Sequence, residues 1–460
     1  MTMWAALLAS RQADADVSKI RARSDRRSAA VMVTLLCFGQ MLNYFDRSVV
    51  AIASGAIMHD LHLSVAQYGL LASAFYGLYG VSGILVGLTL AQRVRPRLLL
   101  TAMIAIWTVV QLPIMVAPTL AVMIASRALL GAAESPSIST SVAAAHEWYA
   151  PHRRGLPTAI VMIGPLLGSI IAPPILTQII SNHSWRAGFL TCALLSGIML
   201  ALLLLFGRDG PDHSAAPSTL DAGPPDDGPA HRSIWLEPTL IAITFMGLCA
   251  YWITAFAVAW LFPVMQSGLG LGAQLSSYAV SAIFALSAVA MLASSSLSQA
   301  LAGRGWRTRH AIVWPCILYL LTGALCFAAT GFAHSTVARL AVLAIAISLM
   351  LPVTGAVPLL VSELAPPARR NMMLVVILSV TSLAGMAAPY VTGRLVGPDG
   401  FDGYRPALQL CAAIVFAGGL VAWLFIHPER PTAGQRHSSA RVGAMPERVP
   451  TSLDDQGQQA

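Results

Sequence analysis

The stretch EWYAPHRR at residues 147–154 has a counterpart much later in the chain, ELAPPARR at residues 363–370. Both stretches keep a glutamate, a proline and a final pair of arginines. A second pair, LAQR at residues 90–93 and LAGR at residues 301–304, is separated by nearly the same length of chain. Two matches at almost one spacing predict that the two halves of the chain are copies of one fold.

Long apolar runs fill the chain around these stretches. Of 460 residues, 56% are hydrophobic and only 10% are charged, whereas soluble domains carry about 25% charged residues. Runs of about 20 apolar residues can cross a bilayer, and they must be helical because lipid offers the backbone no hydrogen-bond partners. The sequence therefore predicts an all-α membrane protein with about twelve transmembrane helices in two six-helix halves. The predicted spans are residues 29–54, 66–91, 97–117, 119–143, 155–180, 187–207, 235–265, 274–301, 310–332, 335–361, 371–396 and 404–426.

Arginine placement predicts the orientation. Arginines cluster before the first span and in alternate loops, which the positive-inside rule places in the cytoplasm. Both termini are then cytoplasmic, and the membrane is the plasma membrane, which is the inner membrane of a bacterium. The predicted segments are a cytoplasmic N-terminal segment 1–28, a first half 29–207, a cytoplasmic linker 208–233, a second half 234–426 and a disordered cytoplasmic tail 427–460.

The net charge of +8 is explained by these loop arginines, so no nucleic-acid partner is expected. No cysteine pair has metal-site spacing, and neither a nucleotide-binding phosphate loop nor a nucleophile constellation is present. We therefore expect neither an enzyme, nor a metal, nor any other cofactor. The expected state is a monomer in the lipid bilayer.

Four charged residues lie deep within predicted spans: Asp46 and Arg47 in the first, Arg127 and Glu134 in the fourth. Charges at membrane depth are costly and therefore indicate function. Arg127 and Glu134 are seven residues apart, about two helical turns, so they share a helix face that must turn into the protein. Asp46 and Arg47 are adjacent and point in different directions, so we expect them to have different partners.

This set of charges can couple protons to an anion. An arginine presents a planar fork that matches a carboxylate. Loss of water drives a buried acid toward its neutral form and a nearby arginine drives it toward its ionised form, so it can load and release a proton. Protonating the acid also frees its arginine for an anion. The alternative is a buried ion-pair network that only orients helices. A channel is a different class of membrane protein, and the duplicated halves and the buried charges favour a carrier over it.

Several motifs resemble the anion:cation symporter family of the major facilitator superfamily. They are NYFDRSVV at residues 43–50, SAFYGLYG at residues 73–80, RALLGAAESP at residues 127–136 and the loop at residues 147–154. The resemblance covers the first half well and the second half loosely. It implies two six-helix halves around a central substrate cavity. It also implies proton-coupled symport of an organic anion, such as a sugar acid or a phthalate-like acid, by alternating access.

The resemblance further implies roles for single residues. The predicted substrate-binding residues are Arg47, Arg127, Tyr44 and Tyr79. The predicted proton-coupling residues are Asp46 and Glu134. The two tyrosines would supply hydroxyl donors to the cavity, and interfacial anchoring or packing is the alternative for them. The partners implied are protons and a small organic anion.

Some features depart from the family pattern. Gln92 stands where the superfamily carries an aspartate that latches one conformation, and Pro165 stands where sugar-acid symporters have an amide. LSVTSLAG at residues 378–385 lacks an asparagine for hydroxyl recognition. These departures favour a less hydroxylated acid. GPLLG at residues 164–168 resembles part of a motif of proton-coupled exporters, although Ile160 replaces its preceding glycine, so a proton-antiporting exporter of drugs or metabolites is the alternative.

Two further groups are interpreted as structural. The stretch HDLH at residues 59–62 lies in an outer loop and is expected to be solvated rather than to bind a metal. The second span carries glycines that suit close helix packing. They are Gly77, Gly80, Gly83 and Gly87.

Overall fold

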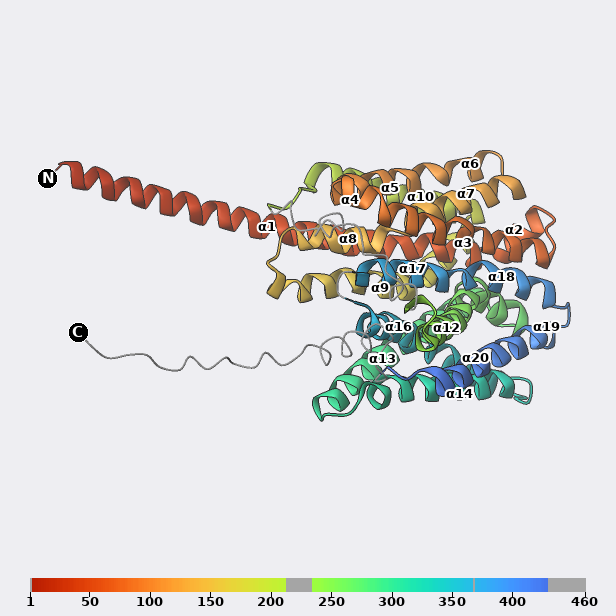
Figure 1. Ribbon diagram of the computed structural model, residues 1–460. Coiled ribbons are helices and arrows are strands. Elements are labelled where there is room, and N and C mark those ends of the chain that lie inside the picture. Colours follow the sequence, from red (N-terminus) through yellow and green to blue (C-terminus); the bar gives the residue numbers. More distant parts are fainter. Residues whose placement is uncertain (1, 212–233, 367–368, 429–460) are drawn as a thin grey trace, which may run out of the picture.

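The computed structural model describes residues 2–211, 234–366 and 369–428, and its helices form two bundles that lie side by side (Figure 1). In these ranges, eleven helical segments are long and apolar enough to cross a membrane. They are Arg27–Ile52, Val65–Leu88, Pro96–Val116, Gly155–Asn182, Trp185–Phe206, Pro238–Gly268, Ala273–Gly303, Arg309–Ala329, Thr336–Leu364, Met372–Leu395 and Arg405–Phe425.

The remaining predicted span, 119–143, is present as two shorter helices. Helix α7 covers Leu120–Glu134 and α8 covers Ser137–His146, with Ser135 and Pro136 between them. Pro136 has no N–H to donate to the carbonyl one turn earlier, which interrupts the helix at this point. With this pair included, the predicted all-helical fold of about twelve membrane-crossing elements is confirmed.

The first half contains the warm-coloured helices of Figure 1. Its helices are α1 (Thr2–Ile52), α2 (Ser54–Asp60), α3 (Val65–Leu88), α4 (Leu90–Arg93), α5 (Pro96–Val110), α6 (Leu112–Val116), α7, α8, α9 (Gly155–Asn182) and α10 (Trp185–Phe206). A short 3₁₀ turn, Pro151–Arg153, precedes α9.

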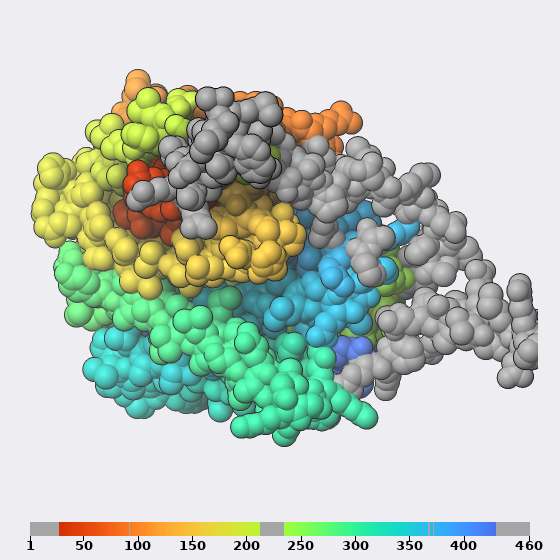
Figure 2. Space-filling model, turned by 90° about the vertical axis from the view of Figure 1, so that its left-hand side faces the viewer, coloured from red at the N-terminus to blue at the C-terminus, as the bar shows by residue number. Residues whose placement is uncertain are grey.

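The second half contains the green-to-blue helices, and Figure 2 shows the two halves as adjoining masses. Its helices are α12 (Pro238–Pro263), α13 (Ala273–Gly303), α14 (Trp314–Ala329), α15 (Thr336–Ser348), α16 (Met350–Leu364), α17 (Arg370–Ser382), α18 (Ala384–Leu395), α19 (Gly400–Gly403) and α20 (Arg405–Phe425). Two π-helical turns, Val264–Gly268 and Arg309–Val313, flank α12 and α14.

Helix α1 is continuous from Thr2 and extends beyond the bundle (Figure 1). The predicted N-terminal segment 1–28 is thus joined to the first span without a break, because neither glycine nor proline occurs before Gly39 to end the helix. Most of the predicted linker, residues 212–233, and most of the predicted tail, residues 429–460, lie outside the described residues.

The two ends of the bundle differ in charge and in closure. One end, called here the arginine-rich end, carries Arg93, Arg153 and Arg304, and α20 ends there (Figure 1). At the opposite end the halves are bonded together. The Tyr68 hydroxyl donates to the carbonyl of Ala259 at 2.7 Å, and the Ser281 hydroxyl donates to the carbonyl of Ile170 at 2.7 Å.

The outer loop at residues 59–62 is tied to α10. The Asp60 carboxylate accepts hydrogen bonds from the Trp185 indole at 3.0 Å and from Arg186 at 2.8 Å. These two donors hold the pKa of Asp60 below its usual value. The interpretation of this loop as simply solvated is therefore incomplete, because its carboxylate anchors the loop to the start of α10.

Helix α3 packs closely against its neighbours through some of its glycines. A β-carbon on Gly80 would lie 3.1 Å from the carbonyl oxygen of Ser379, and one on Gly83 would lie 2.5 Å from the Ser135 hydroxyl. A β-carbon on Gly87 would make only an ordinary contact, 3.5 Å from the Val375 side chain. The packing interpretation is confirmed for Gly80 and Gly83, but not for Gly87 or for Gly77, where a β-carbon would have no neighbour within 4 Å.

Candidate functional site

The four charged residues predicted from the sequence all lie inside the first half. Asp46 and Glu134 are 1% exposed, Arg127 is 3% exposed, and the Arg47 side chain is 8% exposed. Arg127 and Glu134 project from the same side of α7 into the bundle, which confirms the prediction that this face turns inward. Helices α1 and α7 thus place two acids and two arginines in one apolar interior.

Arg47 pairs with Glu134 and not with its neighbour Asp46. Its Nε donates to Glu134 Oε2 at 3.1 Å, and its Nη2 donates to the Tyr79 hydroxyl at 3.4 Å. The guanidinium also lies 5.0 Å from the ring centre of Tyr44 and 5.2 Å from that of Tyr79. Cation–π attraction to these rings stabilises the charge away from water. Both predicted tyrosines therefore contact the Arg47 cation.

Arg127 is bonded to the backbone of α1. Its Nη1 donates to the Asp46 carbonyl at 2.5 Å, and its guanidinium stands 5.1 Å from the ring centre of Phe189. Its Nε and Nη2 have no hydrogen-bond partner among the described residues. A buried guanidinium with free donors can bind an anion in two-point fashion without first losing an existing contact.

The Asp46 carboxylate contacts a residue that the sequence analysis missed. Gln111 lies between α5 and α6 and donates its Nε2–H to Asp46 Oδ1 at 2.7 Å. The prediction that Asp46 and Arg47 have different partners is therefore confirmed. Gln111 could have been noticed in the sequence because it is an amide within the apolar run 97–117. The sequence alone does not show which charged residue it contacts.

A glycine places α7 against α3. A β-carbon on Gly131 would overlap the backbone carbonyl of Phe75. Only glycine permits this approach, and Gly131 lies between Arg127 and Glu134 on α7. The contact holds Glu134 beside α3, where Tyr79 bonds to the same Arg47 that pairs with Glu134, so the local packing of α7 on α3 helps to set the geometry of the ion pair.

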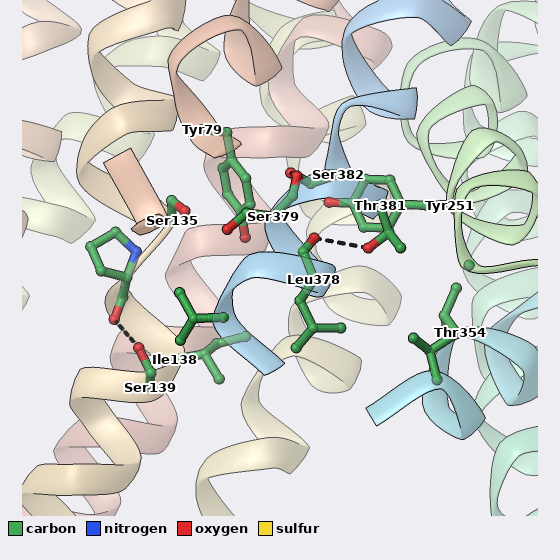
Figure 3. A pocket seen from close by; sticks show the side chains of 15 residues that line it. Tyr79, Ser135, Ile138, Ser139, Tyr251, Thr354, Leu378, Ser379, Thr381 and Ser382 are labelled. Atoms are coloured by element: carbon green, nitrogen blue, oxygen red, sulfur yellow. Dashed lines mark hydrogen bonds between the residues drawn. The ribbon is translucent and has the colours of Figure 1, made fainter. Parts of the chain in front are cut away.

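A cavity of about 330 Å³ opens between the halves next to this cluster. Tyr79 and Ser135 line it from the first half, and Ser379 and Ser382 line it from the second (Figure 3). Of the predicted site residues, Tyr79 is the one that reaches its wall. Glu134 directly precedes Ser135, so the Arg47–Glu134 pair lies just behind the cavity wall.

The second-half wall offers hydroxyl groups and no charge among its lining residues. The Ser382 hydroxyl donates to the carbonyl of Ser379 at 2.7 Å, and the Thr381 hydroxyl donates to the carbonyl of Leu378 at 2.8 Å. Tyr251 of α12 completes this wall (Figure 3). These oxygens keep lone pairs available to a ligand, whereas the charged groups lie only on the other side.

The GPLLG stretch has a packing role. A β-carbon on Gly164 would overlap the carbonyl of Cys37, and one on Gly168 would overlap that of Met41. Both carbonyls belong to α1, so these glycines let α9 lie directly on the helix that carries Asp46 and Arg47. The stretch is thereby explained without reference to the direction of transport.

Comparison with known proteins matches this chain to transporters over both halves. The family model of the Major Facilitator Superfamily matches residues 36–389. A probable L-galactonate transporter of Escherichia coli (strain K12) is 26% identical over 416 residues, covering 87% of this chain and 90% of that protein. A probable sulfoacetate transporter, SauU, of Cupriavidus necator is 24% identical over 422 residues, covering 86% of this chain and 94% of that protein.

A solved structure shares the fold. A bacterial homologue of the human lysosomal transporter Spinster, in an inward-facing and unoccupied conformation, has a TM-score of 0.73 to this chain at 16% sequence identity. The match covers 87% of this chain and 97% of that chain.

Proposed function

The chain belongs to the major facilitator superfamily, and from this premise we propose that it is a proton-coupled symporter of an organic carboxylate anion. Membership makes it a multi-pass membrane protein and a secondary transporter rather than an enzyme. The proton coupling, the anion and the direction are the proposal, and they rest on the charges around the cavity.

The observation that carries the proposal is the ion pair behind the cavity wall. Arg47 and Glu134 are 3.1 Å apart, and Tyr79 bonds to Arg47 while lining the cavity. As long as Glu134 is ionised, it competes with any incoming anion for Arg47. A proton on Glu134 removes that competition and leaves the arginine free to attract a carboxylate.

Charge balance gives the same coupling. With both acids ionised, the two acids and two arginines of the cluster sum to zero. A bound monoanion would leave one uncompensated negative charge in a low-dielectric interior, where charge interactions are strong. One proton taken up by Asp46 or Glu134 restores neutrality. Binding of anion and proton together is therefore favoured over binding of either alone.

The structure is closed at one end of the bundle and has its cavity toward the other end, as expected for one state of an alternating-access transporter. The halves are bonded at the end opposite the arginine-rich end, and the cavity is lined by residues from Tyr79 to Gly83 on α3, toward the arginine-rich end. If the arginine-rich end is cytoplasmic, as the positive-inside rule favours, this is an inward-facing arrangement. We accordingly propose cytoplasmic termini, a bacterial inner membrane and a monomeric transport unit.

The relatives support an anionic substrate but do not identify its carbon skeleton. L-galactonate and sulfoacetate, which name the substrates of two relatives, differ in size and in hydroxyl content but share a negative charge. Arg127, with free donors in the interior, is the group best suited to that shared feature. Gly164 and Gly168 pack on α1, a role compatible with either direction of transport, so the exporter stays the alternative that the test must separate.

The test is transport by purified protein in liposomes that contain a pH-sensitive dye. A panel of acids, including L-galactonate, sulfoacetate and benzoate, is added outside, and lipophilic cations are added in parallel. We expect at least one acid to acidify the interior and to accumulate when the outside is acidic. Protein-dependent proton movement opposite to a lipophilic cation, with no acid moving protons inward, would establish the exporter instead.

A further inference from the structure

Gln111 occupies an interruption in the third membrane-crossing element. It lies between the end of α5 at Val110 and the start of α6 at Leu112. Pro113 follows and cannot donate a backbone hydrogen bond to the carbonyl of Val109, which weakens the helix at this turn. The Gln111 side chain is 1% exposed. A buried amide at such a turn needs a partner, and its partner is the carboxylate of Asp46.

The Gln111 amide donates hydrogen bonds through one atom and leaves its oxygen without a partner in the described part of the chain. Nε2 lies 2.7 Å from Asp46 Oδ1 and 3.4 Å from the carbonyl of Trp107, one turn earlier. Gln111 Oε1 and Asp46 Oδ2 have no hydrogen-bond partner among the described residues. The amide therefore has one free acceptor and the carboxyl one free oxygen, and both atoms are buried.

Neither buried arginine forms an ion pair with this carboxylate. Arg127 donates to the Asp46 backbone carbonyl, and in the described part of the chain no arginine nitrogen lies within 4.0 Å of the Asp46 carboxylate oxygens. Arg47 is bonded to Glu134. The charged or titratable groups that face the Asp46 carboxyl are Arg47 of α1, Arg127 and Glu134 of α7 and Cys192 of α10.

A primary amide can serve both protonation states of a carboxyl group. Its NH₂ donates to an ionised carboxylate, and after a half-turn its carbonyl oxygen accepts from a protonated carboxyl. An arginine cannot accept a hydrogen bond from the O–H of a protonated carboxyl, because it has donors and no acceptor. A group that must gain and lose a proton in a dry interior is therefore better partnered by an amide than by a guanidinium.

We propose that Gln111 is a positioning residue for proton exchange at Asp46, holding the ionised carboxylate through Nε2 and the protonated carboxyl through Oε1. The inference rests on the proposed proton coupling and adds to it the residue that keeps both states of Asp46 in place. A proton from the aqueous side adds to Oδ1, the amide turns to accept it, and release reverses both changes.

The test compares Gln111→Leu with a matched control, Gln40→Leu. Gln40 is also 1% exposed and buried in the first half, and its amide donates to the Ser141 hydroxyl at 2.9 Å instead of to an acid. Uptake of an acid from the panel above is measured in liposomes over a range of external pH. Counterflow exchange at equal pH on both sides is measured in parallel.

Gln111→Leu removes a hydrogen bond to the ionised carboxylate and one to the protonated carboxyl. Bonds to charged groups are the stronger of the two, so the ionised form loses more and the proton is held more tightly. We expect the pH of half-maximal uptake to rise by about one unit. Exchange should persist, and Gln40→Leu should keep the wild-type profile. A wild-type profile in Gln111→Leu, or an equal shift in both variants, would overturn the inference.

Two further variants keep the test decisive. If Gln111→Leu does not reach the membrane, Gln111→Asn retains the amide but shortens its reach, and it should shift the profile in the same direction. Adding Asp46→Glu to Gln111→Asn restores the reach and should move the profile back toward that of the wild-type protein; a profile that does not move back counts against a direct contact. If the wild-type protein itself moves no protons with the acid, the proposed function fails, and this inference fails with it.

Discussion

The two halves share a fold but differ in what they bury. The first half buries Asp46, Arg127, Glu134 and Glu147, together with most of the Arg47 side chain. In the described part of the second half, by contrast, every buried polar residue is a serine or a threonine. The repeated loop stretches and helix pattern were kept in both copies, whereas the deep charges are found in one. Both halves line the cavity, and under the proposed function its coupling chemistry lies on the first-half side alone.

This contrast predicts that the two halves contribute differently to transport. Changes to first-half charges should alter proton coupling and the maximal rate, because in the proposed cycle the two acids exchange a proton and the two arginines bind the anion. Changes to second-half hydroxyls should alter affinity alone, because a serine has no charge to exchange. The predictions that follow test this division, beginning with the largest expected effect.

Arg127→Lys should reduce uptake by about 100-fold, in line with the loss expected when a buried, hydrogen-bonded charge is disrupted. Lysine keeps the charge but has one nitrogen, so it cannot both bond to the Asp46 carbonyl and present a fork to an anion. Initial uptake rates at matched membrane abundance measure the effect. Arg186→Lys is the control: its partner Asp60 is at the surface, where such pairs contribute little, so transport should stay near wild type. Near-normal uptake by Arg127→Lys would remove Arg127 from the site.

Gly131→Ala should destabilise the protein by about 1–3 kcal/mol, the usual range for overpacking. Its β-carbon would overlap the Phe75 carbonyl and push α7 away from α3. Gly77→Ala, on α3 with open space around it, should be neutral or slightly stabilising. Thermal unfolding in detergent distinguishes the two, and equal midpoints would mean that the close contact is not important for stability.

Ser382→Ala and Ser379→Ala should raise KM a few-fold, since one hydrogen bond contributes about 0.5–1.5 kcal/mol. The maximal rate and its pH profile should match those of the wild-type protein, because these side chains only line the second-half wall. Uptake over a concentration series at several pH values provides both quantities. Loss of proton coupling in either variant would show that the chemistry is not confined to the first half.

The sequence was sufficient for properties that depend on one helix at a time. The inward face of α7 follows from the spacing of Arg127 and Glu134, and the separate partners of Asp46 and Arg47 follow from their adjacency. Which side chains meet across helices could not be predicted in this way. The amide of Gln111 lies far from Asp46 in the chain, and its contact depends on how α5 packs on α10, which in turn packs on α1.

Close backbone approach was the other feature that the sequence did not reveal. Gly131 was not singled out among the glycines, yet it touches the backbone of Phe75. Gly77 was included in the packing set, yet a β-carbon there would meet nothing within 4 Å. A glycine allows close approach, but only the three-dimensional arrangement decides which glycines are used for it. The break at Ser135–Pro136 likewise divides a span that hydropathy alone predicts as continuous.

The most direct test of the central claim is transport by Glu134→Gln, which removes the ionisable acid from the Arg47 pair while preserving its size. Labelled acid and interior pH are followed together in liposomes with an inward proton gradient, and counterflow exchange is measured without one. The claim predicts that accumulation against the gradient and the accompanying acidification are lost while exchange persists, since a neutral amide competes with the anion for Arg47 less strongly than a carboxylate does. Accumulation and acidification equal to those of the wild-type protein would contradict it.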